Sequence, residues 1–380
     1  MSPALLEVSG GATCHESKSL RGDKVRMKSI NRSFACLVLL IGLAPAAGTQ
    51  ALDMKDARLK ETKSVVDAAF VEDKRSNPPN SLDAGAPDDS SPSKVAYFSS
   101  EKVKAAELAD SPKPAGKVPN TKTGNLYPWS EGDQSLAVRI SRQETGEQAQ
   151  THEFRHVMYV LSGSATFVTD GTMVDPKPFE PITPWGSKEM RASRIDGGRT
   201  YHLSKGDLIT VPKEIPHWWK DVPDSPLIYI AINFVGAHGR DLSPEPGVVT
   251  YFDSEKMAAG FSKGGMRPDG KGGSVVFDGK DVGNQYQVYA ARRDGGPWDA
   301  EVHALDSDVI YVQEGSATLV TGGTVVKPRN IEPNETRGTA IMGGETRHLS
   351  KGDLIIVPHG TPLWYKEARG PFSFLLVKIR

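Results

Sequence analysis

From residue 95 onwards, apolar residues occur in short runs that are bounded by Gly, Pro or Asp. The runs are rich in β-branched and aromatic residues, which is typical of β-strands, and helical signals are mostly confined to residues 99–108 and 254–259. Many short strands joined by turns predict an all-β sandwich or barrel. Examples of the expected strands are residues 157–161, 165–169, 207–211, 227–234, 309–312, 317–321, 353–357 and 372–379.

The pattern of strands occurs twice. Residues 201–220 read YHLSKGDLITVPKEIPHWWK, and residues 347–366 read RHLSKGDLIIVPHGTPLWYK. The segments 97–102 (YFSSEK) and 251–256 (YFDSEK) form a further matching pair. Each copy has the length of a domain and not that of a solenoid repeat, so the chain is a tandem duplication.

Segments of a different composition surround the two copies. Residues 73–94 are rich in Pro, Ser and Asp and almost free of large apolar side chains, so residues 52–94 are expected to be mostly a disordered linker. A joint that contains Pro and Gly, at residues 240–247, separates the copies. We therefore expect one domain at residues 95–240 and a second at residues 248–380.

The N-terminal segment has the features of a secretory signal peptide. Lys28 and Arg32 precede an apolar run at residues 34–44, and small residues follow it. We expect residues 1–51 to be removed, with Met27 as the true start, which predicts a periplasmic or secreted protein. An uncleaved membrane anchor is the alternative.

The composition of the rest of the chain excludes several classes of function. Cleavage would remove the only two cysteines, Cys14 and Cys36, and would leave neither a disulfide nor a thiolate ligand for a metal. The formal net charge is −1 and Lys and Arg are scattered, so we expect no binding to nucleic acid. We also expect no stable membrane insertion after signal cleavage.

Three of the nine histidines are clustered in the first copy. His152 and His156 flank the start of one expected strand, and His217 follows Pro216 near another. Antiparallel neighbours in a barrel could bring such positions together. Three converging imidazoles suit Fe, Mn, Zn, Ni or Cu, and an open coordination position would allow Lewis-acid or oxygen chemistry. The alternative is a polar barrel mouth whose histidines bond to their neighbours.

The spacing of these residues carries a resemblance to a known family. The first copy contains Gln150-x-His152-x3-His156 and, later, Pro212-x4-His217. These segments resemble the two motifs of the cupins, and the duplication resembles a bicupin. The resemblance places His152 on the second histidine of the first motif, His156 on its glutamate, and His217 on the histidine of the second motif. Gln150 stands at the first histidine and is a possible fourth ligand, whereas the leading glycine is off register.

The second copy departs from the family pattern. Glu301 and His303 stand at the two histidines of the first motif, and Asp308 stands at its glutamate. The histidine of the second motif is replaced by Leu363, which cannot bind a metal. We therefore expect Glu301, His303 and Asp308 to form a degenerate site.

The resemblance implies an all-β fold of two tandem cupin-type barrels (double-stranded β-helix or jelly roll) with few short helices. It implies one divalent metal ion in the first barrel, a small-molecule substrate or ligand, and possible homo-oligomers. Activities in the family include those of dioxygenases, isomerases and lyases. We expect a metal-dependent enzyme acting on a small polar molecule, either a non-haem dioxygenase or a metal-assisted isomerase or lyase. The alternatives are a non-catalytic module that binds a sugar or another small ligand, and an assembly protein.

Other residues of the first copy have two interpretations. Trp219 would share a strand face with His217, where it lines the substrate pocket or packs in the core. Glu153 is a candidate base near the site. The Pro-rich insertion at residues 176–188 is either a lid or a passive loop. Two matching pairs indicate a structural role, namely Glu189 with Arg191 and Glu335 with Arg337.

Overall fold

The computed structural model describes residues 94–109, 121–128, 135–179, 189–235, 247–263, 274–279 and 285–380. The predicted signal peptide, nearly all of the predicted linker, most of the joint and residues 180–188 lie outside these ranges. All the described residues belong to one compact unit. None of the helices in the described part has the length and apolar character that a membrane span requires.

The described residues form mostly strands, with two short helices, which confirms the predicted all-β class. The elements of the first half are β1 (Ala96–Phe98), α2 (Ser100–Leu108), β2 (Thr121–Tyr127), β3 (Leu136–Gln143), β4 (Ala149–Thr151), β5 (Arg155–Thr169), β6 (Thr172–Val174), β7 (Lys177–Pro178), β8 (Met190–Ala192), β9 (Arg194–Asp196), β10 (Arg199–Ser204), β11 (Leu208–Val211) and β12 (His217–Phe234). Those of the second half are β13 (Thr250–Phe252), α3 (Ser254–Lys263), β14 (Ser274–Phe277), β15 (Tyr286–Gly295), β16 (Ala300–His303), β17 (Ser307–Thr321), β18 (Thr324–Val326), β19 (Arg329–Glu332), β20 (Glu335–Gly338), β21 (Ala340–Met342), β22 (Glu345–Ser350), β23 (Leu354–Val357) and β24 (Leu363–Ile379).

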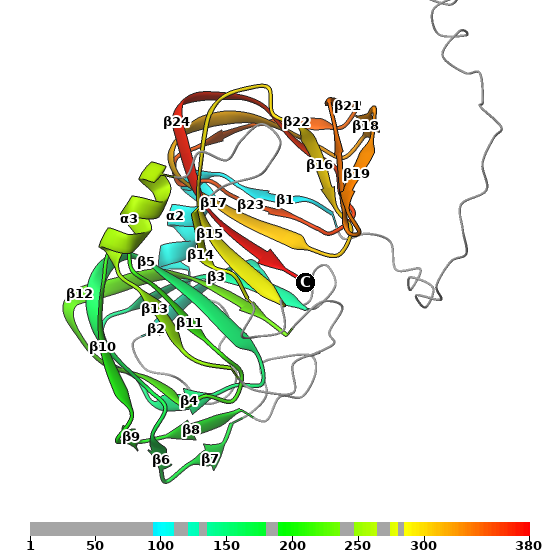
Figure 1. Cartoon of the computed structure of the whole chain (residues 1–380). Coiled ribbons are helices and arrows are strands. Elements are labelled where there is room, and N and C mark those ends of the chain that lie inside the picture. Colours follow the sequence, from blue (N-terminus) through cyan, green and yellow to red (C-terminus); the bar gives the residue numbers. More distant parts are fainter. Residues whose placement is uncertain are drawn as a thin grey trace, which may run out of the picture. The chain divides into compact units, whose positions relative to one another are not determined.

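Each copy is built around one ten-stranded antiparallel sheet (Figure 1). The first sheet has the order β13-β11-β5-β12-β4-β8-β7, with β10 beside β5 and with β3 and β2 extending from β12. The second has the order β1-β23-β17-β24-β16-β20-β19, with β22 beside β17 and with β15 and β14 extending from β24. Two further sheets of two strands each, β6 with β9 and β18 with β21, complete the described strands. The two sheets have corresponding strand orders, as expected for two copies that arose by duplication.

The long strands are apolar on both faces because each face meets a different core. In β12, Ile230 and Ile232 lie in a core that contains residues of both sheets, whereas Tyr229 and Ala231 lie in the core inside the first barrel. Successive side chains of a strand point to opposite faces, so this alternation follows from the pleat. Side chains with the parity of Tyr229 therefore face the interior of the first barrel, where the candidate site lies.

The two copies exchange a short strand. β1 pairs with β23 of the second sheet, and β13 pairs with β11 of the first. In Figure 1 the cyan strand β1 lies beside β23, among the strands of the second half. Sheet membership therefore crosses the predicted boundaries between residues 95–240 and 248–380.

The exchanged strands explain why two distant sequence repeats match so closely. Gly206 has φ +92° in the predicted Lys-Gly-Asp turn. The buried Asp207 that follows it accepts a hydrogen bond from the Ser204 hydroxyl at 3.3 Å and shorter ones from three further groups. These are the Tyr251 hydroxyl at 3.0 Å and the backbone N–H groups of Ser254 at 2.6 Å and Ser204 at 2.7 Å. Asp353 accepts the equivalent bonds from the Tyr97 hydroxyl at 2.9 Å and from the N–H groups of Ser100 and Ser350 at 2.8 Å each. Hydrogen bonds to the aspartate of each turn therefore hold the turn against the exchanged segment.

Candidate metal centre

The structure brings the three predicted histidines of the first barrel together. His152 lies between β4 and β5, His156 lies on β5, and His217 is the first residue of β12. One nitrogen of each ring lies within 4.8 Å of the others, and the residues are 4%, 8% and 2% exposed respectively. The pairing of β12 with both β4 and β5 accounts for this arrangement, because it places the second motif, which contains His217, beside the first motif, which contains His152 and His156.

The rings of His156 and His217 are held by acceptors on their Nδ1 side. His156 Nδ1 lies 2.7 Å from the Asn233 side-chain oxygen, and His217 Nδ1 lies 2.9 Å from the Ile215 carbonyl. Both oxygens can only accept, so each Nδ1–H donates and each Nε2 keeps its lone pair. The buried Nε2 of His156 has no hydrogen-bond partner among the described residues. A buried, free imidazole lone pair beside two further imidazoles fits a metal ion.

A carboxylate that the sequence did not identify as part of the site lies next to the third ring. His152 Nδ1 is 3.2 Å from Glu189 Oε2, and Glu189 is only 1% exposed. The other oxygen of Glu189 is paired with Arg191. The predicted structural pair therefore exists, but it also borders the histidines. Because the pair occurs in both copies, the sequence indicated a structural role only and gave no sign of the contact with His152.

Burial keeps the three imidazoles neutral. Desolvation lowers the pKa of His217 to about 4 and lowers the pKa values of His152 and His156 well below the usual range. For the latter two, neighbouring positive side chains and the other imidazoles act in the same direction. Neutral imidazole is the form that binds a metal, so at neutral pH no proton has to leave before binding.

The other predicted residues of the first barrel lie around this cluster. Gln150 is buried on β4, and its side-chain nitrogen donates to Glu147 Oε1 at 3.1 Å. Trp219 is 1% exposed and packs on Phe167, with ring centroids 4.3 Å apart, in the core inside the barrel. Glu153 is half-buried in the bend between β4 and β5. Their roles as a fourth ligand or as pocket residues stay predictions.

The strand registers equate positions in the two barrels. The register pairs His217–Gln150 and His156–Asn233 of the first barrel correspond to Leu363–Glu301 and Asp308–Lys378 of the second. Two imidazoles of the first barrel are therefore replaced, and a lysine enters in place of the amide that orients His156.

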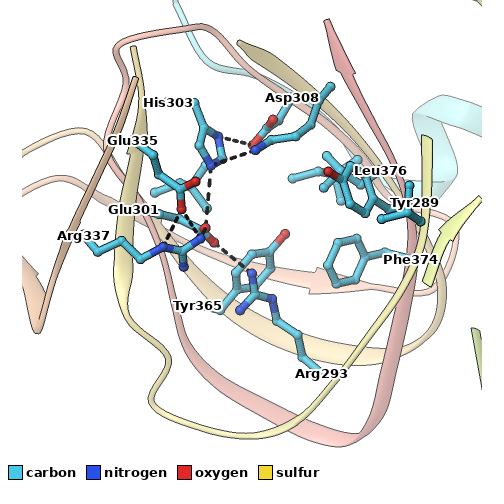
Figure 2. A pocket seen from close by; sticks show the side chains of 14 residues that line it. Tyr289, Arg293, Glu301, His303, Asp308, Glu335, Arg337, Tyr365, Phe374 and Leu376 are labelled. Carbon is cyan, nitrogen blue, oxygen red and sulfur yellow. Dashed lines mark hydrogen bonds and ion pairs between the residues drawn. The ribbon is translucent and has the colours of Figure 1, made fainter. Parts of the chain in front are cut away.

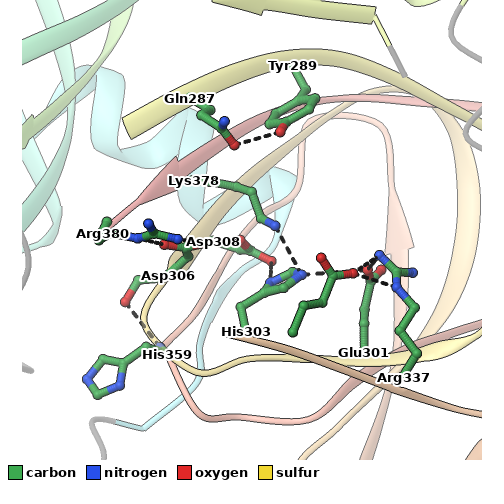
Figure 3. A network of polar contacts seen from close by, with 12 residues as sticks. Gln287, Tyr289, Glu301, His303, Asp306, Asp308, Arg337, His359, Lys378 and Arg380 are labelled. Carbon is green, nitrogen blue, oxygen red and sulfur yellow. Dashed lines mark hydrogen bonds and ion pairs between the residues drawn. The ribbon is translucent and has the colours of Figure 1, made fainter. Parts of the chain in front are cut away.

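His303 is the imidazole that the second barrel keeps at the corresponding site, and it has no free lone pair. His303 Nδ1 lies 3.0 Å from Asp308 Oδ2, and Nε2 lies 3.1 Å from Lys378 Nζ and 3.6 Å from Glu301 Oε2 (Figure 3). Burial is the largest influence on the pKa of His303 and lowers it, but the Asp308 and Glu301 carboxylates together outweigh burial and raise the pKa to about 9. A charged His303 carries a proton on Nε2, and a neutral one accepts from Lys378. In both states the nitrogen is engaged.

Arginines surround the carboxylate that stands beside His303. Glu301 Oε1 lies 2.8 Å from Arg293 Nη2, and Glu301 Oε2 lies 2.9 Å from Arg337 Nη2 (Figure 2). Arg337 also contacts Glu335. Glu301, His303 and Glu335 come close enough to suggest a metal group, but protein cations already neutralise them. That this site is degenerate stays a prediction.

No family model and no curated protein matches the sequence. Among solved structures, salicylate 1,2-dioxygenase from Pseudaminobacter salicylatoxidans is 14% identical, with a TM-score of 0.49 over 86% of this chain and 95% of that chain. Procruciferin, an 11S globulin from Brassica napus, is 10% identical, with a TM-score of 0.41 over 72% of this chain and 84% of that chain. The coconut allergen cocosin is 11% identical, with a TM-score of 0.40 over 70% of this chain and 84% of that chain.

These similarities are distant, and the fold is evident from the chain's own sheets and motifs. Both ten-stranded sheets have the same strand order, and the residues of the two predicted motifs meet inside each of them. A tandem pair of such antiparallel barrels, with the first carrying three converging histidines, gives this chain the fold of a bicupin.

Proposed function

We propose that the protein is a metal-dependent bicupin enzyme that acts on a small polar molecule in its first barrel. One divalent ion would be held by His152, His156 and His217. The observation that carries this proposal is the convergence of three buried, neutral imidazoles, one of which presents an Nε2 without a partner among the described residues. His303, at the corresponding site of the second barrel, offers no such nitrogen, because both its ring nitrogens contact described charged groups.

The residues around the cluster fix the ligands in place. Asn233 and the Ile215 carbonyl hold two rings through Nδ1, and Glu189 stands beside the third. Such outer contacts set the tautomer and the orientation of metal-binding histidines. A bound divalent ion would supply Lewis acidity, and with iron, copper or manganese it would supply redox chemistry with oxygen. With three protein ligands, room is left for a substrate oxygen.

Two arginines favour a substrate that carries a negatively charged oxygen. The Nε of Arg139 and the Nε and Nη1 of Arg191 are buried and have no hydrogen-bond partner among the described residues. Both guanidinium groups lie close enough to lower the pKa of His152. Guanidinium groups pair with carboxylate oxygens through parallel N–H donors. We therefore infer a small anionic substrate, with Glu153 as the candidate base if the reaction moves a proton.

Elemental analysis of the purified protein tests the proposal. We expect about one metal ion per chain in the wild type, lost in His152→Ala and in His217→Ala. The control is His303→Gln, which changes the residue of the second barrel that corresponds to His152 and should keep the metal. Iron, copper or manganese would direct the search to oxygen consumption, and zinc to isomerase and lyase assays. A wild type without metal after reconstitution would support the non-catalytic binding module instead.

We also propose that the protein is periplasmic or secreted, because of the charged and apolar pattern at residues 28–51. Mass spectrometry of the protein recovered from cells tests this location. A mature N-terminus near residue 52 supports it, whereas a protein that retains residues 27–51 contradicts it.

A further inference from the structure

The second barrel encloses a cavity of about 220 Å³. In Figure 2, charged side chains line one side of this cavity, and Phe374, Leu376 and Tyr289 line the other. A cavity of about 150 Å³ with apolar walls is already large enough for benzene. The space therefore suits a molecule with one ring or a compact aliphatic body.

Three hydrogen-bond donors in the cavity wall have no partner among the described residues. They are the Nε of Arg293, the Nη1 of Arg337 and the hydroxyl of Tyr365. The three residues are 2%, 5% and 2% exposed. A buried polar group without a partner costs free energy, so three of them on one wall require an explanation.

The paired nitrogens of the same arginines hold the free donors in place. Arg293 Nη2 and Arg337 Nη2 each lie within 2.9 Å of an oxygen of Glu301, as Figure 2 shows. The Arg293 guanidinium also stacks on the Tyr365 ring, with 4.3 Å between its carbon and the ring centroid. The guanidinium planes are therefore fixed before any ligand arrives, which lowers the entropic cost of binding.

Two of these donors, those of Arg293 and Tyr365, result from differences between the copies, whereas Arg337 corresponds to Arg191 of the first barrel. By strand register, Arg293 stands where the first barrel has Gln143, and Tyr365 stands where it has Trp219. Lys378 likewise stands at the position of Asn233. The copy that lost two histidines has thus gained two cations and a phenol on the interior face of its barrel.

The charges of the wall leave room for one further negative charge. Three cationic side chains and three carboxylates line the cavity, and His303 adds a positive charge when it is protonated. The cations are Arg293, Arg337 and Lys378, and the carboxylates are Glu301, Asp308 and Glu335. A metal cation would meet positive neighbours here, whereas a single anion would be balanced by them.

We propose that the second barrel is a binding site for a small organic monocarboxylate with an aromatic or compact aliphatic body. The carboxylate oxygens accept hydrogen bonds from the free N–H groups of Arg293 and Arg337 and from the Tyr365 hydroxyl. The body lies against Phe374 and Leu376. This site is separate from the metal centre and does not require metal in the first barrel.

Calorimetric titration of the full chain with benzoate tests the proposal, with benzyl alcohol as the uncharged probe. We expect benzoate to bind and benzyl alcohol to bind at least about ten-fold more weakly, because it cannot form charge-assisted bonds. The informative variant is Tyr365→Phe, which removes a hydroxyl that has no partner among the described residues and so keeps the fold. It should weaken benzoate binding about ten-fold or more.

Two further variants keep the test decisive. Arg293→Lys retains a charge beside Glu301 but removes the free Nε–H, and it should also weaken benzoate binding. His217→Ala changes the metal centre alone and should leave the affinity for benzoate unchanged. The proposal is overturned if the wild type does not bind benzoate, if Tyr365→Phe binds it equally well, or if His217→Ala abolishes binding. The last result would assign benzoate to the first barrel, and the metal content of the wild type would still be decided separately.

Discussion

At the scale of single residues, the two barrels differ in what surrounds the Nε2 atoms of their site histidines. In the first, the Asn233 side chain and the Ile215 carbonyl accept hydrogen bonds from Nδ1 of His156 and His217. The Nε2 lone pairs of these two imidazoles are therefore not used by these bonds. In the second, both nitrogens of His303 face charged groups, Asp308 on one side and Lys378 on the other. An imidazole whose two nitrogens are engaged cannot ligate a metal, so the same fold holds a candidate metal site in one copy and an ion network in the other.

The burial of His217 predicts how the stability of the metal-free protein depends on pH. The pKa of His217 is about 4 in the folded protein, against about 6.5 in an unfolded chain. Below pH 6.5 the unfolded state takes up a proton that the folded state rejects, so stability falls as the pH decreases towards 4. Urea unfolding should show a loss of roughly 2 kcal/mol from this residue between pH 7 and pH 5.

The matched variant for this measurement is His217→Leu, which introduces the residue found at the corresponding position of the second barrel. It should weaken the pH dependence of the free energy of unfolding by the same amount. An equal dependence in variant and wild type would mean that the imidazole titrates in the folded state as it does in water.

The candidate ligands could be predicted from the sequence because their spacing is local. Gln150, His152 and His156 lie within one motif, and His217 follows a proline at a fixed distance from a turn. Asn233 and Glu189 could not be predicted in the same way. Asn233 meets His156 only through the register of β12 on β5, and register is decided by packing across the whole sheet.

At the scale of elements, the exchanged strands β1 and β13 carry the contacts that the sequence repeats encode. The apolar runs predicted the strands well, although β5 and β17 continue through Gly163 and Gly315, where two separate strands were expected in each copy. Both glycines have positive φ, at +78° and +76°, so the chain bends there without ending the strand. The exchange could not be read from the sequence, because YFSSEK and YFDSEK carry the same pattern and fit either sheet.

The fastening of the exchanged strands predicts a large effect of Asp207→Ala. The substitution leaves four partly buried donors without their acceptor, namely the hydroxyls of Tyr251 and Ser204 and the N–H groups of Ser204 and Ser254. We expect the free energy of unfolding in urea to fall by about 2–4 kcal/mol. Asp196→Ala is the control, because its pair with Arg194 is largely exposed and should change stability by less than about 0.5 kcal/mol. If Asp207→Ala lost as little stability as Asp196→Ala, the contacts of the exchanged strand would add little to the stability of the fold.

At the scale of the whole described unit, the two barrels share one core and one set of exchanged strands. Residues of both sheets form a continuous apolar cluster, in which Tyr159 and Tyr311 lie with ring centroids 6.4 Å apart and Phe234 packs on Tyr286 at 5.0 Å. Neither sheet keeps all its strands if the other copy unfolds, because β1 and β13 each belong to the opposite sheet. The barrels should therefore unfold together although only one of them carries the proposed metal.

This coupling predicts that metal bound in the first barrel stabilises the second. A ligand that binds only the folded state adds about 2.7 kcal/mol at a free concentration 100 times its dissociation constant. Differential scanning calorimetry should show one transition for residues 94–380, and adding metal should move the whole transition to higher temperature. Removal of the metal with a chelator should reverse the shift, and His217→Ala should not respond to either treatment. Two transitions, of which metal moves only one, would mean that the shared core is too weak to join the barrels, and that the exchanged strands dissociate before either barrel unfolds.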